Sequence, residues 1–181
     1  MKTRLIITCS CLFLMACAGS ASTRGTDELL VSVRVTTGER SKDSGSQTTT
    51  ITVERDEIVC VRTYGGSSRR RPDPPRKVYK LSPAEKRHLV ELIQSNNLLV
   101  TDSTTLPRPS SNYQYFEVSV DITLGGRKGA VDISGPRNAA GVKDNRLYQS
   151  TRLLIEELYL ILNGHDKSIH FEELILDQTG R

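Results

Sequence analysis

Residues 115–124 read YFEVSVDITL and alternate strictly between apolar and polar side chains. A two-residue period rich in β-branched residues is typical of a strand that buries one face and exposes the other. The following Gly125-Gly126-Arg127-Lys128 predicts a hairpin into a second strand over residues 130–134. We therefore expect an antiparallel sheet at the centre of the fold.

The hairpin register that we predict sets Ile122 opposite Val131 and Val120 opposite Ile133, so that apolar residues face each other. The same register sets Asp121 opposite Asp132 on the polar face. Because like charges directly opposite each other destabilise a sheet, we interpret this pair as neutralised by a cation such as Arg34, or as solvated. A weak cation site, or a contact for a basic partner, is the alternative.

Two further segments upstream have the strand pattern. Valines alternate with polar residues over Leu29–Thr37, and residues 48–53 follow a similar period. A turn over residues 54–57 predicts a hairpin. In this hairpin Val53 would pair with Ile58 and Ile51 with Cys60, apolar against apolar in both cases. A continuous bulged strand is the alternative. Residues 78–81 predict a short strand, and Thr101–Asn112 is expected to be a turn-rich connection.

Two helices are predicted. Ser82-Pro83-Ala84-Glu85 forms a capping box with proline at the first helical position, and this helix is expected to end near Asn96. A strong apolar stripe predicts the second helix over residues 145–162, with Gly164 just past its end.

These elements predict an α+β fold, with five to six antiparallel strands and both helices packed on one face. The other face, rich in Thr, Ser, Arg and Glu, is expected to meet water. A single domain over residues 28–164 is long enough to bury a core, and residues 165–181 are expected to form a C-terminal tail.

The N-terminus has the features of a signal peptide. Lys2 and Arg4 precede an apolar run over residues 5–15, which is too short to span a bilayer as a helix. Leu14-Met15-Ala16-Cys17 then resembles the lipobox of bacterial lipoproteins, although Met15 is bulkier than usual at its position. This resemblance implies removal of residues 1–16 and lipidation of Cys17.

The lipobox resemblance also implies a location. Lipid on Cys17 would anchor the chain through a tether over residues 17–27. Because Ala18 rather than aspartate follows the cysteine, lipoprotein sorting rules imply the periplasmic face of an outer membrane, if the cell has one. Ordinary secretory cleavage at Ala16-Cys17-Ala18 is the alternative.

Composition excludes several classes of protein. The 181 residues are 36% hydrophobic and 25% charged, which excludes a polytopic membrane protein and a fully disordered chain. Without residues 1–16, which contain Lys2 and Arg4, the chain has 23 basic and 21 acidic residues, a formal charge of +2 that favours no nucleic-acid role. If lipid blocks Cys17, Cys60 has no cysteine partner for a disulfide or a metal cluster.

No motif in the sequence favours an enzyme. The chain has no His-Glu-x-x-His or Gly-x-Ser-x-Gly motif, and Gly125–Gly129 leads into a strand rather than into a helix as a phosphate loop does. His165, Asp166 and His170 are a weak alternative metal site. We therefore expect a protein without a cofactor or a catalytic site.

The best binding candidate is a basic, proline-rich loop that contains Arg69, Arg70, Arg71, Arg76 and Lys77. Near a bilayer these cations would meet anionic headgroups or an acidic polymer. A solvated loop without a ligand is the alternative. We thus expect a lipid-anchored binding or accessory module that contacts the membrane through the lipid on Cys17. Its candidate partner is an envelope protein or an anionic surface.

The order of the expected elements is similar to that of small envelope lipoproteins of unassigned role. Strand hairpins come first, then the helix start Lys80-Leu81-Ser82-Pro83-Ala84-Glu85, a further hairpin and a last helix. The same order weakly resembles emfourin-type inhibitors of thermolysin-like metallopeptidases. That resemblance implies an alternative function, an anchored or secreted peptidase inhibitor that presents the loop from Gly135 or the basic, proline-rich loop. It transfers no inhibitory residue.

Overall fold

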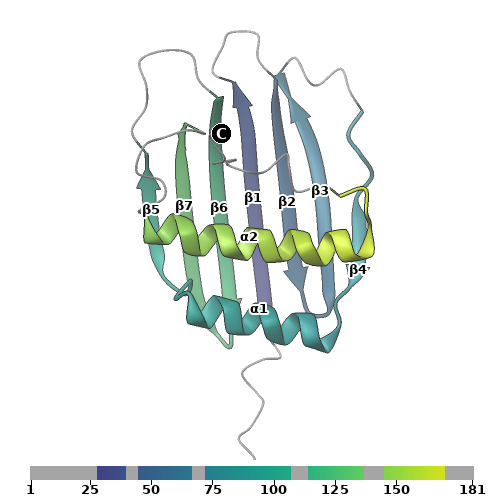
Figure 1. Cartoon of the computed structure of the whole chain (residues 1–181), viewed down its shortest axis with the longest axis vertical. Helices are drawn as coiled ribbons and strands as arrows, with labels where there is room; N and C mark the ends of the chain where they lie inside the picture. Colours follow the sequence, from purple (N-terminus) through teal and green to yellow (C-terminus); the bar gives the residue numbers. More distant parts are fainter. Residues whose placement is uncertain (1–27, 40–44, 67–71, 107–113, 137–144, 170–181) are drawn as a thin grey trace, which may run out of the picture.

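The computed structural model describes residues 28–39, 45–66, 72–106, 114–136 and 145–169. These residues form an α+β fold in which two helices lie across one face of a single sheet (Figure 1). The elements are β1 (Leu29–Glu39), β2 (Ser46–Glu54), β3 (Glu57–Gly65), β4 (Lys77–Lys80), α1 (Pro83–Ser95), β5 (Thr101–Thr105), β6 (Gln114–Leu124), β7 (Arg127–Pro136) and α2 (Arg146–His165). The predicted fold class is confirmed.

The sheet has seven strands in the order β4-β3-β2-β1-β6-β7-β5, rather than the five to six that we predicted. It is also mixed rather than wholly antiparallel, because β5 runs parallel to β7. The first strand in the sequence, β1, therefore lies at the centre, between β2 and β6.

The β2–β3 hairpin has the predicted register. Val53 pairs with Ile58 and Ile51 with Cys60 across a two-residue turn at Arg55-Asp56. All four paired side chains are buried, which explains why the apolar pattern determined the register correctly. Arg55 has a left-handed backbone with φ of 57°, which a tight turn of this kind requires.

The predicted register of the β6–β7 hairpin is wrong by two residues. Val120, not Ile122, lies opposite Val131, and Ile122 lies opposite Gly129. The turn consists of Gly125 and Gly126 alone, and both have positive φ angles, 55° and 79°. Two glycines of this conformation close the two-residue turn that matches strand twist, whereas the predicted register needs a four-residue loop.

The first part of the predicted connection, Thr101–Thr105, is strand β5. Residues 98–100, which precede β5, pass very close to β7. A Cβ added to Gly129 of β7 would lie 2.5 Å from the backbone oxygen of Leu98. The amide of Ala130 donates to the Val100 carbonyl at 2.8 Å and so begins the parallel ladder. The strand escaped prediction because all five of its residues are polar and it lies at the edge of the sheet.

Both helix starts agree with the sequence. The Ser82 hydroxyl accepts from the Glu85 amide at 3.2 Å, and the Glu85 carboxylate accepts from the Ser82 amide at 2.7 Å, so the capping box is formed. Asn145 caps α2 through the Tyr148 amide. However, α2 continues to His165, so Gly164 lies inside the helix instead of beyond its end.

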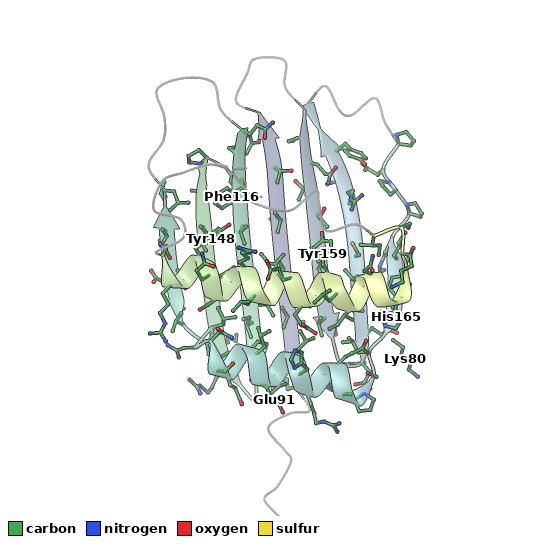
Figure 2. The ribbon with its side chains drawn as sticks, in the orientation of Figure 1. Lys80, Glu91, Phe116, Tyr148, Tyr159 and His165 are labelled. Carbon is green, nitrogen blue, oxygen red and sulfur yellow. The ribbon has the colours of Figure 1, made fainter. Side chains whose placement is uncertain are left out.

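The core lies between the sheet and the two helices. Phe116 of β6 packs against Tyr148 of α2, with ring centroids 6.1 Å apart (Figure 2). Burial raises the pKa of Tyr148 to about 12. Ile169, four residues beyond α2, is 3% exposed and joins the same core, so the described residues of the predicted tail belong to the packed domain.

Candidate functional site

The face of the sheet that turns away from the helices presents mainly polar side chains. Strand residues alternate between the two faces of a sheet. In β1, β2, β6 and β7 the residues that face the helices are buried, and the residues between them form a hydroxyl-rich set on the opposite face. This set, which we call the open face, includes Ser32, Arg34, Thr36, Thr48, Thr50, Thr52, Glu117, Ser119, Asp121, Asp132 and Ser134. It is the polar face that the sequence predicted.

One depression on the open face, which we call the β5 groove, has a volume of about 360 Å³ and spans β1, β6, β7 and β5. Its lining includes Arg34, Thr36, Ser103, Thr104, Thr105, Glu117, Ser119, Asp132 and Ser134. Hydroxyls and three charged side chains thus share one shallow concavity, which suits a polar ligand better than an apolar one.

The predicted Asp121–Asp132 opposition does not exist. Asp132 lies opposite Ser119, whose hydroxyl donates to its carboxylate, and Asp121 lies opposite Ala130. The two-residue glycine turn shifts the register and so separates the carboxylates. Arg34, proposed as the neutralising cation, lies opposite Ser119 on the other side and lines the β5 groove together with Asp132.

A second depression, the β4 depression, lies at the other end of the open face and has a volume of about 700 Å³. Val59 and Val61 provide apolar surface within it. Its other lining residues are Thr52, Glu54, Arg55, Asp56, Glu57, Arg76 and Lys80, so both signs of charge surround the valines. Val78, which pairs with Val59, is 45% exposed beside it.

The basic loop of the sequence analysis is divided by the structure. Arg69, Arg70 and Arg71 lie outside the described residues. Arg76 lines the β4 depression, where a ligand would meet it. Lys77 instead bonds within the fold: its Nζ lies 2.5 Å from Asp166 Oδ2 and 2.8 Å from the Ser168 hydroxyl.

Lys77, Tyr79, His165 and Asp166 form a polar cluster, the clasp, that joins β4 to the end of α2. The Tyr79 hydroxyl donates to Asp166 at 2.9 Å, and the Tyr79 ring stacks on the His165 ring with centroids 5.2 Å apart. Bonds from Lys77, Ser168 and Tyr79 hold the pKa of the Asp166 carboxyl well below its usual range. Local sequence patterns do not reveal this cluster, because Lys77 and Asp166 are 89 positions apart in the chain.

Cys60 lies in the core, and His88 and His165 each lie near a glutamate. Cys60 is buried, and burial raises the pKa of its thiol. His88 lies 3.4 Å from Glu157, and His165 lies 3.8 Å from Glu85. The described ranges contain no group of three or more His, Cys, Asp and Glu arranged to hold a metal ion. His170, of the weak metal alternative, falls outside them.

The N-terminal predictions also fall outside the described residues, since these begin at Glu28. Cys17, the signal peptide over residues 1–16 and the tether over residues 17–27 are therefore carried by the sequence pattern. Within the described part of the chain, neither α1 nor α2 is long and apolar enough to cross a bilayer. The residues after Pro136 that we considered for an inhibitory loop likewise lie outside until Asn145.

Comparison with known proteins adds no assignment: no protein-family model matches the chain, and no curated protein matches it significantly.

Proposed function

We propose that this chain is a lipid-anchored protein of the cell envelope that acts as a binding module rather than as an enzyme. Its lipid would be carried by Cys17, and its partner would dock on the open face of the sheet. The motif Leu14-Met15-Ala16-Cys17 supports the anchor. The open face supports the binding role.

The observation that carries the proposal is the asymmetry of the sheet. One face is covered by α1 and α2 (Figure 1), whereas the other presents hydroxyls, charged groups and two shallow depressions over seven strands. Open, shallow depressions suit contact with a macromolecular surface, since enclosed pockets are typical of small-molecule sites.

The anchor is tested by mass spectrometry of the mature protein and by cell fractionation. We expect a lipid-modified Cys17 at the N-terminus and release of a Cys17→Ser variant from the membrane fraction. An unmodified thiol at Cys17, or membrane association unchanged in the variant, contradicts the anchor.

The binding role is tested by photo-crosslinking in the cells that produce the protein. A photoreactive amino acid replaces Ser119 at the centre of the open face, or Leu160, which is 67% exposed on α2 and provides the control. We expect a discrete crosslinked product from position 119 and none from position 160. Equal crosslinking from both positions, or none from 119, contradicts docking on the open face.

A further inference from the structure

The two edges of the sheet differ in how well they are protected against pairing with another chain. Natural edge strands are commonly protected by lysines, prolines, bulges or shortness. β4 has only four residues, begins and ends with lysine, and follows Pro74-Pro75. Strand β5, residues Thr101–Thr105, is nearly as short, with five residues, and Pro107 follows it in the sequence, but it contains no lysine. Among the described residues, the β5 edge therefore lacks the lysines that protect the β4 edge.

The backbone groups of β5 that point away from the sheet follow from its hydrogen bonds to β7. The Val100 carbonyl accepts from Ala130, and the Leu106 amide donates to Ser134. In a parallel pair, alternate residues direct both backbone groups to the same neighbour, so the even-numbered residues face β7. Thr101, Ser103 and Thr105 consequently direct their N–H and C=O groups outward.

The Ser103 amide has a local partner at this edge. It donates to the carboxylate Oδ1 of Asp102 at 2.7 Å, and both residues are exposed. An aspartate that bonds the next amide offers an alternative to ladder pairing. Asp102 thus occupies the central outward donor of β5 while leaving the outward carbonyls of the strand unaffected.

The β5 groove runs along the inner side of this edge. Ser103 and Thr105 lie in the same rows as Asp132 and Ser134, and Glu117 lies opposite Ser134. A strand added outside β5 would be about 10 Å from β7, two strand spacings away. Because Ser103 is small, a long side chain from the added strand reaches over it toward the Asp132 carboxylate.

We propose that the β5 edge binds an extended peptide segment of a partner protein by strand addition, with a lysine or arginine of that segment directed to Asp132. Main-chain bonds to Thr101, Ser103 and Thr105 supply affinity, and the β5 groove supplies selectivity. Glu117 and Asp132 outnumber Arg34 in the lining of the β5 groove, so the local charge favours a basic side chain. The inference rests on the proposed binding role and specifies its partner.

The test uses the full-length, isotope-labelled protein in detergent micelles and two matched peptides, acetyl-(Thr-Lys)4-amide and acetyl-(Thr-Glu)4-amide. Binding is followed by NMR titration of the backbone amides. We expect the lysine peptide to bind at least fivefold more tightly than the glutamate peptide. Shifts should centre on residues 101–105, and a lysine peptide N-methylated at alternate residues should bind at least threefold more weakly.

Three variants separate the parts of the proposal. Ser103→Pro removes an outward donor that makes no bond to β7, whereas the control Ser103→Ala retains it. Because the Asp102 carboxylate occupies this donor, both variants are made in an Asp102→Ala background, in which we expect three- to tenfold weaker peptide binding for Ser103→Pro than for Ser103→Ala, as for the loss of about one hydrogen bond. Asp102→Ala frees the same donor and should tighten binding. Asp132→Asn should reduce the preference for lysine, while Asp121→Asn, outside the groove, should not.

Equal binding by Ser103→Pro and Ser103→Ala, with the N-methylated peptide binding as well as its parent, overturns the proposal. So do shifts centred on Val59 and Val61, which place the peptide in the β4 depression. Self-association of Asp102→Ala without peptide binding assigns the edge to a second copy and also overturns it. Each of these results leaves crosslinking from position 119 as the separate test of the binding role.

Discussion

The Gly129→Ala substitution is the sharpest test of how β5 is held in the sheet. The added methyl carbon would lie 2.5 Å from the Leu98 oxygen, 2.8 Å from the Leu99 Cα and 2.9 Å from the Val100 nitrogen. All three are backbone atoms, so no side-chain rotation relieves the contact. Either β7 or residues 98–100 must move.

The cost follows from what holds those residues. Leu98 is fully buried, its amide donates to the Ile93 carbonyl at the end of α1, and the Val100 carbonyl accepts from Ala130. Overpacking of a well-packed site costs about 1–3 kcal/mol. Weakening one of these hydrogen bonds adds about 1 kcal/mol. We expect Gly129→Ala to lower the free energy of unfolding by about 2–4 kcal/mol.

The assay is urea unfolding at pH 7, followed by far-ultraviolet circular dichroism. Gly164→Ala is the matched control, because Gly164 lies inside α2 and a Cβ there meets no atom within 4 Å. Alanine is favoured over glycine in a helix, and Gly164 lies in the last turn of α2, so this variant should gain at most about 0.5–1 kcal/mol. A Gly129→Ala protein within 0.5 kcal/mol of the parent would refute the close approach of residues 98–100 to β7.

Three further predictions concern single groups. The folded-state pKa of Asp166 lies below its ordinary 3.8, so its carboxylate stabilises the fold above that pH, and this contribution is lost on acidification. In urea unfolding between pH 6 and 2.5, the free energy of unfolding should fall less for Asp166→Asn than for the parent. Equal losses of stability would contradict the clasp. Ser82→Ala should cost about 1 kcal/mol in the same assay at pH 7, and no cost would argue against the capping box. Cys60 should resist alkylation, followed by mass spectrometry, until urea unfolds the protein; rapid labelling of the native protein would disagree with its burial.

The sequence predicted those parts of the fold that local chemistry determines. The Ser82–Glu85 capping box is complete within four residues, and the structure contains it. The β2–β3 register followed from apolar residues on both strands with one compatible pairing. In β6 and β7, several registers place apolar residues opposite each other, so the decision fell to the backbone conformation of Gly125 and Gly126. Composition alone does not reveal that conformation.

Long-range partners explain most of what the sequence did not reveal about the candidate site. β5 has no apolar period because the neighbouring β7 and the sheet edge, rather than its own residues, make it a strand. The β5 groove joins Arg34, Ser103 and Asp132 from three separate strands. The polar character of the open face was predictable, because alternation along each strand specifies it.

The central position of β1 has a mechanical consequence. The described chain enters the sheet at Leu29, and β1 is paired with β2 from Leu30 to Gly38 and with β6 from Leu29 to Glu39 (Figure 1). A pulling force applied through the residues before Glu28 acts along this strand and loads both ladders in shear. Many bonds then share the force at once instead of breaking one after another, which suits a domain tethered at that end and strained from its far side.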